Sequence, residues 1–256
     1  MQVEFMITFE DIIVYFIAVL YAVTVLTVAD VARRKLNMGS DFTRKIVHLF
    51  AGAAIWTVPY YPHPWVATLV ALTFVIMLGM ASSHRFERFF HAMARSEDEQ
   101  SDSVRGPFWY AVSITVLTAI FTFTGNDAWY FIAAAAIHIM MLGDGLSAPI
   151  GMKWGVNHCI EIKGSKRSLH GCSALFIFGF IGSLIAFWFF GVVNYQVFVS
   201  GGQILFIEMI ILALAGAVTA TLVELVSPKG TDNVTVPMIC TVVMFYIAIL
   251  LGIIVI

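Results

Sequence analysis

Long apolar runs, separated by shorter polar stretches, dominate the chain. A helix that crosses a bilayer needs about 20 mostly apolar residues, and the chain contains eight candidates of this kind. They cover residues 9–31, 45–61, 64–82, 107–125, 128–148, 171–193, 203–226 and 234–255. The pattern predicts an all-α transmembrane bundle with about eight spans.

Two of these runs are irregular. The run at 45–61 is short, and the fifth run meets Gly143, Gly145 and Pro149 near its end. Glycine and proline both disfavour the interior of a helix. We therefore expect the fifth helix to be broken within residues 143–149.

The positive charges are segregated along the chain. All 14 Lys and Arg residues lie in or beside alternate polar connections, near residues 32–44, 83–106, 149–170 and 227–233. Because Lys and Arg favour cytoplasmic loops, these connections are predicted to be cytoplasmic, with both termini on the other side. Residues 1–256 are expected to form a single integral membrane domain.

Composition strengthens the membrane assignment. Hydrophobic residues make up 60% of the chain and charged residues only 12%, whereas a soluble domain carries about 25% charged residues. The net charge of −2 provides no basic field, so no nucleic-acid partner is expected. The three cysteines show no CxxC spacing and do not indicate a disulfide framework.

The first candidate cluster lies at the start of the 45–61 run. Arg44 and His48 are one helical turn apart, and Lys45 is adjacent. Cations beside the free N–H groups of a first helical turn form an anion site. The preference of Lys and Arg for the cytoplasmic ends of membrane helices explains Arg44 and Lys45 equally well. It does not explain His48, which points into the span.

The second cluster is rich in glycine. Asp144 lies 17 residues after Asp127, about 25 Å along a helix, and hence at the inner membrane boundary. A carboxylate there is costly unless it is paired or binds a cation, although a helix end facing water is a plain alternative. Glycines let backbone amides approach a phosphate closely, and the stretch contains Gly143, Gly145, Ser147, Gly151 and Gly155.

The third and fourth clusters add cations and carboxylates. The third cluster is the segment Lys163-Gly164-Ser165-Lys166-Arg167-Ser168-Leu169-His170-Gly171. Its three cations and two hydroxyl groups suit a triphosphate. A positively charged inner loop is an equally good interpretation. Farther on, Glu224 ends one apolar run, and Asp232 and Asn233 precede the next. N-capping of the last helix would by itself explain Asp232.

Together these clusters resemble the CTP-dependent lipid-alcohol kinases, a family that comprises phytol, farnesol and polyprenol kinases, dolichol kinase and fungal diacylglycerol kinase. Five short motifs occur in the family's order and on one predicted face of the membrane. They are Arg44-Lys45-Ile46-Val47-His48, Val104-Arg105-Gly106-Pro107, the stretch from Gly143-Asp144 to Gly155, Lys166-Arg167-Ser168-Leu169-His170-Gly171, and Asp232-Asn233-Val234-Thr235-Val236-Pro237, which Glu224 precedes.

The resemblance implies a kinase that transfers the γ-phosphate of CTP to a membrane lipid alcohol, with phytol, geranylgeraniol or a longer polyprenol as the leading class. The implied catalytic residues are Asp144, His48, Lys166 and Asp232, with the general base open between His48 and a carboxylate. Mg²⁺ would be held by Asp144, Asp232, Asn233 and Glu224. The implied nucleotide and phosphate contacts are Arg44, Lys45, Gly143, Gly145, Ser147, Gly151, Gly155, Lys166, Arg167, Ser168, His170 and Gly171.

His170 departs from the family pattern, which usually has Glu at this position. A histidine is neutral or positive near pH 7 and can donate a hydrogen bond to a phosphate oxygen. We therefore expect His170 to contact phosphate rather than metal.

Two alternatives remain beside this interpretation. A secondary transporter would use the broken helix at 143–149, with a cation path through His138, Asp144 and Glu208. Transporter sites usually lie near the midplane between repeated halves, whereas these clusters gather at one predicted face and no repeat is visible. The second alternative is a diacylglycerol kinase of the same family.

The charge segregation predicts which loops can be reached from outside the cell. In a background that lacks the native cysteines, a membrane-impermeant maleimide should label Tyr195→Cys in intact cells and should leave Lys163→Cys unlabelled until the cells are opened. Labelling of Lys163→Cys from outside would contradict the predicted orientation.

Overall fold

The computed structural model describes most of the chain. The described residues are 6–36, 38, 40–80, 105–123, 125, 127–155, 159–162, 165–228 and 231–255. They belong to two compact units, an N-terminal unit (Glu4–Val116) and a C-terminal unit (Leu117–Ile256). Most of the predicted polar connection near 83–106 lies outside the described residues.

The described part of the N-terminal unit is helical. Its elements are α1 (Phe9–Lys35), α2 (Ser40–Gly52), the 3-10 helix η1 (Ala53–Tyr60), α3 (Val66–Gly79) and the first part of α6 (Arg105–Thr122). A small apolar core joins these helices through Leu26 and Ala29 of α1, Val47 of α2, Leu78 of α3 and Ala111 of α6. The short predicted run at 45–61 is therefore helical, with its second half wound more tightly than an α-helix.

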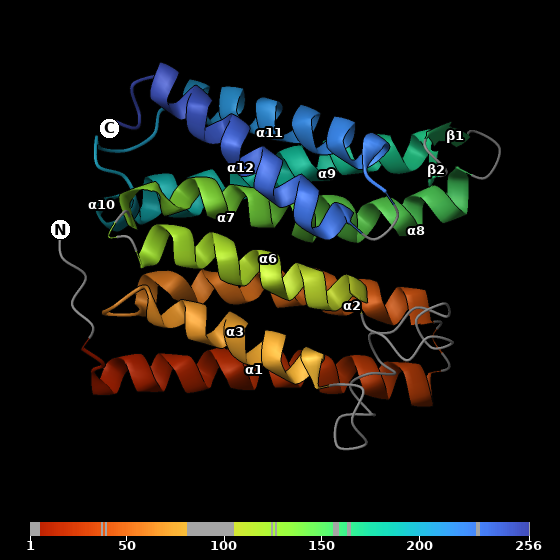
Figure 1. The fold of residues 1–256 in the computed structure, drawn as a ribbon, viewed down its shortest axis with the longest axis horizontal. Helices are drawn as coiled ribbons and strands as arrows, with labels where there is room; N and C mark the ends of the chain where they lie inside the picture. The colour runs from red at the N-terminus through yellow and green to blue at the C-terminus, as the bar shows by residue number, and fades with distance from the viewer. Residues whose placement is uncertain are drawn as a thin grey trace. The chain divides into compact units, whose positions relative to one another are not determined.

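The described part of the C-terminal unit contains helices and one hairpin (Figure 1). Its elements are η2 (Asp127–Trp129), α7 (Tyr130–His138), the π-helical turn η3 (Ile139–Asp144), α8 (Gly145–Trp154), β1 (Cys159–Ile162), β2 (Ser165–Ser168), α9 (Leu169–Ala186), the π-helical turn η4 (Phe187–Val193), α10 (Tyr195–Phe198), α11 (Phe206–Val226) and α12 (Asp232–Leu250).

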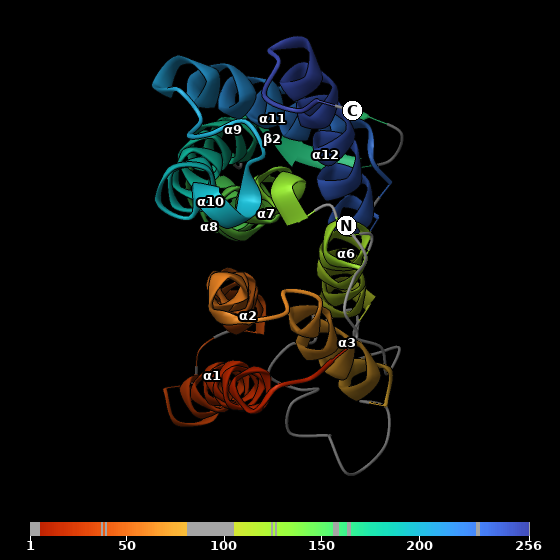
Figure 2. The ribbon, with the colours of Figure 1, turned by 90° about the vertical axis from the view of Figure 1, so that its left-hand side faces the viewer.

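Helix α7 is the central element of the C-terminal unit. It packs against α9, α11 and α12, and Figure 2 shows these helices nearly end-on. Every residue of α7 is buried, which a helix that is apolar on all sides requires. Small residues allow the close approach: a Cβ on Gly182 of α9 would lie 2.7 Å from the carbonyl oxygen of His138.

Five helical segments among the described residues are long and apolar enough to cross a membrane. They are Phe9–Lys35, Asp127–Trp154, Leu169–Val193, Phe206–Val226 and Asp232–Leu250, and the shorter apolar helices are Val66–Gly79 and Gly106–Thr122. The prediction of a helical membrane protein is thus supported. The count of eight spans, the orientation and the single membrane domain stay predictions.

The expected break at 143–149 is wrong. The helix continues from Tyr130 to Trp154, and it widens into the π-helical turn η3 instead of unwinding. Pro149 lies inside α8, where its missing N–H removes a single backbone hydrogen bond. A π-helical turn inserted in an α-helix is a frequent feature of functional sites.

The predicted loop at 149–170 also differs from the structure, and the fold is not purely α-helical. Helix α8 extends to Trp154, and β1 and β2 form an antiparallel hairpin before α9 begins at Leu169. The alternation of residues in Cys159–Ile162 and Ser165–Ser168 is too short to reveal strands among so many helical signals. The hairpin sets where Arg167 lies, because this residue pairs with Ile160 across the two strands.

Asp11 anchors the start of α1, a role that the sequence analysis missed. Its carboxylate is fully buried and accepts hydrogen bonds from the backbone N–H and hydroxyl of Thr8, each at 2.9 Å. It also accepts the backbone N–H of His63 at 3.0 Å and lies 2.8 Å from Nδ1 of the His63 ring. One carboxylate thereby joins α1 to the turn that precedes α3.

Replacing Asp11 by alanine should destabilise the N-terminal unit, because several partly buried donors would lose their acceptor. We expect a loss of about 3 kcal/mol, measured by unfolding of the purified protein in detergent. Glu10→Ala is the matched control, since Glu10 is the exposed neighbour in the same helical turn. Equal stability of the two variants would contradict the anchoring role.

Candidate active site

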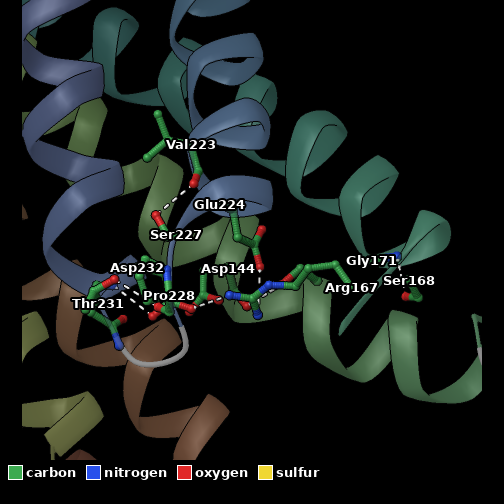
Figure 3. A network of polar contacts seen from close by, with 12 residues as sticks. Asp144, Arg167, Ser168, Gly171, Val223, Glu224, Ser227, Pro228, Thr231 and Asp232 are labelled. Atoms are coloured by element: carbon green, nitrogen blue, oxygen red, sulfur yellow. Dashed lines mark hydrogen bonds and ion pairs between the residues drawn. The ribbon is translucent and has the colours of Figure 1, made fainter. Parts of the chain in front are cut away.

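Arg167 connects three elements at the hairpin end of the C-terminal unit. Its Nη2 donates to Oδ2 of Asp232 at 2.9 Å, and its Nη1 lies 3.4 Å from Oε1 of Glu224. Figure 3 shows the side chain extending between these two carboxylates, with Asp144 close by. Residues that are 57 and 65 positions after Arg167 in the sequence thus share one guanidinium group.

The local structure of each element explains why the two carboxylates meet. Glu224 lies in the last turn of α11 and Asp232 is the first residue of α12, so a short connection brings both to the same end. Ser227 strengthens that connection: its hydroxyl donates to the carbonyl of Val223 at 2.7 Å and lies 2.7 Å from the hydroxyl of Thr235. Ser227 was not among the predicted site residues, because a lone serine after a helix carries no distinctive pattern.

Asp144 adds a third carboxylate to the electrostatics of Arg167. It ends the π-helical turn η3 and is partly buried. Burial by itself would lower the pKa of Arg167, but the surrounding carboxylates of Glu224, Asp232 and Asp144 outweigh that effect and raise the pKa. Arg167 is therefore a permanent cation within an acidic environment.

Three of the predicted phosphate-binding glycines surround Ser168. A Cβ would lie 2.6 Å from the Ser168 hydroxyl oxygen at Gly151, 2.4 Å from it at Gly155 and 3.0 Å from it at Gly171. The same hydroxyl caps α9 by accepting the backbone N–H of Gly171 at 3.0 Å. Close packing against Ser168 therefore explains these glycines in structural terms, and their predicted contact with phosphate stays a prediction.

The remaining residues of the glycine-rich stretch are also tightly placed. A Cβ on Gly143 would lie 2.8 Å from a methyl group of Leu175 in α9. Gly145 is buried at the start of α8. The buried Ser147 donates its hydroxyl to the carbonyl of Asp144 at 3.1 Å. This stretch thus holds Asp144 against α9.

Arg167, Glu224, Asp232 and the neighbouring Asp144 form a polar network. Three further predicted residues lie close to it in sequence. His170 is exposed in the first turn of α9, and Asn233 is buried in the first turn of α12, where its backbone N–H donates to Oδ1 of Asp232 at 3.0 Å. Lys166 belongs to β2, but its side chain lies outside what the structure describes. Exposure leaves His170 accessible to a ligand.

The first predicted cluster belongs to α2 of the N-terminal unit. Lys45 and His48 are buried there, whereas the side chain of Arg44 is not among those described. The ring of His48 stacks on that of Tyr110, with centroids 3.9 Å apart and planes inclined by 23°. Tyr110 was not among the predicted site residues, because its only signal in the sequence is that it follows the Arg105-Gly106-Pro107 motif.

The donor set suits a hard divalent cation in its chemistry, since all four predicted metal ligands offer oxygen. Among the described residues, however, no three His, Cys, Asp or Glu side chains are arranged to hold a metal ion together. Mg²⁺ commonly uses only one or two carboxylates, with phosphate and water oxygens completing its shell. The arrangement therefore fits a metal that binds together with a nucleotide better than a metal held by protein alone.

The chain is similar to two proteins with assigned names. It is 28% identical over 227 residues to a phytol kinase of Synechocystis sp., a match that covers 87% of this chain and 86% of that protein. It is 25% identical over 226 residues to a probable chloroplastic phytol kinase of Triticum aestivum, covering 84% and 70% of the two chains. These relatives support a lipid-alcohol kinase family. No family model matches the chain, and no solved structure matches it significantly.

The packing around Ser168 can be tested by a double-mutant cycle. Gly151→Ala should destabilise the protein by about 1–3 kcal/mol, because the added methyl group would overlap the Ser168 hydroxyl. In a Ser168→Ala background that hydroxyl is absent, so the same change at Gly151 should have little effect on thermal unfolding in detergent. Equal losses in both backgrounds would show that the two residues are not coupled.

Proposed function

We propose that this protein is a membrane kinase that transfers the γ-phosphate of CTP to a polyisoprenoid alcohol, giving the lipid phosphate. The observation that carries the proposal is the similarity to a phytol kinase over 87% of the chain. The motif resemblance supports CTP as donor. Phytol, geranylgeraniol and longer polyprenols are the acceptors of the proposed class.

The charges of the network suit the demands of phosphoryl transfer. This reaction needs positioning of the reactants and neutralisation of phosphate charge more than covalent chemistry. In the proposal Arg167 and Lys166 neutralise the triphosphate, and His170 donates a hydrogen bond to a phosphate oxygen. Arg44 and Lys45 would contribute at the transferred phosphate.

Phosphoryl transfer would also draw on the charge neutralisation that a divalent cation such as Mg²⁺ supplies when bound. The side chains proposed to hold it are Asp144, Asp232, Glu224 and Asn233. Asp232 and Glu224 are buried at the ends of two helices, which restricts their motion and keeps both carboxylates directed toward the same region.

The acceptor alcohol needs a group that removes its proton. His48 is one candidate, because its stacking on Tyr110 fixes the plane of the imidazole ring. A carboxylate of the network is the other. The hydrocarbon tail of the alcohol would remain among the apolar helices, so that only the hydroxyl group has to reach the polar side chains.

The transporter alternative loses its structural basis. It required an unwound helix at 143–149, whereas the helix is continuous there. The ion pairs that Arg167 forms lie instead where α11 finishes and α12 begins. A diacylglycerol kinase remains the alternative within the same chemistry.

The function is tested by incubating the purified full-length protein with γ-labelled CTP or ATP, Mg²⁺ and single lipid alcohols. We expect label to be transferred from CTP to phytol, geranylgeraniol or a longer polyprenol. Preferential labelling of diacylglycerol would instead support the alternative, a diacylglycerol kinase. Absence of transfer to every alcohol from both nucleotides would contradict the proposal.

Asp144→Asn should abolish this activity while the protein remains folded, because a neutral amide cannot replace a metal-binding carboxylate. The expected loss exceeds tenfold, or about 1.4 kcal/mol of activation free energy. Glu161→Gln, an exposed change in β1, is the matched control and should retain activity. Activity of Asp144→Asn within about tenfold of the wild type would remove Asp144 from the metal-binding role.

A further inference from the structure

Arg167 occupies oxygens that the proposed metal would also need. Its guanidinium contacts Oδ2 of Asp232 and Oε1 of Glu224. The other oxygen of Asp232, Oδ1, accepts the backbone N–H of Asn233. Both oxygens of Asp232 are therefore engaged by the protein, and a cation can reach Oδ2 only if Arg167 gives up that contact.

The pairing has a clear physical reason. Carboxylates that are removed from water are stable only when a cation or a set of donors compensates their charge. Asp232 and Glu224 are each only 7% exposed, and Arg167 supplies the compensating charge. A divalent cation bound at the same oxygens would compensate the two carboxylates equally well. The divalent cation and the Arg167 guanidinium would repel each other.

The hydrogen bonding of Arg167 is incomplete, which favours exchange over a permanent structural role. Its Nε is buried and has no hydrogen-bond partner among the described residues. Its contact with Glu224, at 3.4 Å, is longer than its contact with Asp232. A guanidinium matches phosphate as well as carboxylate in its planar geometry, so a nucleotide offers Arg167 an alternative set of acceptors.

The position of Arg167 makes such a change possible without rearranging the helices. It lies on β2, one residue before the Ser168 cap that begins α9. The backbone is held by the hairpin and by that cap, whereas the long side chain carries the charge. Rotation of the side chain alone would therefore release the carboxylates without moving the backbone.

We propose that Arg167 is an exchangeable counter-ion, which pairs with Glu224 and Asp232 until a divalent cation binds with the nucleotide and then contacts the triphosphate. The inference rests on the proposed function, in which these carboxylates bind the metal. It adds that metal and arginine compete for the same oxygens. Removal of the arginine therefore strengthens metal binding and weakens nucleotide binding, two opposite effects of one substitution.

The test compares Arg167→Gln and Arg167→Lys with the wild type in the detergent-solubilised full-length protein. Lys153→Gln is the control, because it removes one positive charge from an exposed side chain that lies over Trp154, 4.7 Å from the ring centroid. Binding of Mn²⁺ without nucleotide is measured by electron paramagnetic resonance. Binding of a fluorescent CTP analogue is then measured in the presence of Mg²⁺.

We expect Arg167→Gln to bind Mn²⁺ about tenfold more tightly than the wild type and the CTP analogue at least tenfold more weakly, a tenfold change being about 1.4 kcal/mol. Arg167→Lys should show the same two trends to a smaller extent, since it keeps the charge but loses the planar fork. Lys153→Gln should match the wild type in both measurements. Circular dichroism verifies that each variant is folded.

Unchanged or weaker Mn²⁺ binding by a folded Arg167→Gln protein would overturn the exchange and make Arg167 a permanent structural ion pair. If that variant does not fold, Arg167→Lys decides the question by the same criterion. Phosphate transfer by the wild-type preparation is measured in parallel. If the wild type transfers phosphate but Arg167→Gln binds Mn²⁺ no more tightly, only the exchange is contradicted. If the wild type transfers no phosphate but Arg167→Gln binds Mn²⁺ more tightly, only the kinase function is contradicted.

Discussion

A single guanidinium group joins β2, α11 and α12 at the polar end of the C-terminal unit. Its contacts with Asp232 and Glu224 compensate two buried carboxylates that belong to different helices. Without this cation, the two negative charges would face each other in an apolar environment where water cannot stabilise them. The position of the carboxylates, and hence the chemistry proposed for them, depends on that compensation.

The rest of the C-terminal unit supports this network through close helix packing. Helix α7 is buried along its whole length, and the continuous helix from Tyr130 to Trp154 carries Asp144 to the level of the hairpin. The π-helical turn η3 changes the direction in which residues after Ile139 project. Small residues at the contacts with α9 allow this arrangement, because a Cβ at Gly143 or Gly182 would overlap its neighbours.

The sequence predicted the helices well, because long apolar runs and segregated charges are strong signals over 20 or so residues. It also grouped Arg167, Glu224 and Asp232 as one site through their motifs. It failed where structure depends on local backbone detail or distant partners. Gly143 and Pro149 suggested a break, but neighbouring helices hold the segment in a helical form. Likewise, no periodicity could reveal the hairpin at 159–168 or the buried Asp11–His63 contact.

In the proposed function, the nucleotide binds where Arg167, Glu224 and Asp232 converge. The most direct test is photo-crosslinking of the wild-type protein with a photoreactive CTP analogue, followed by mass-spectrometric mapping of the modified peptides. We expect modification within residues 143–171 or 224–237, and excess CTP with Mg²⁺ should suppress it. Modification confined to other parts of the chain, or modification that CTP does not suppress, would contradict it.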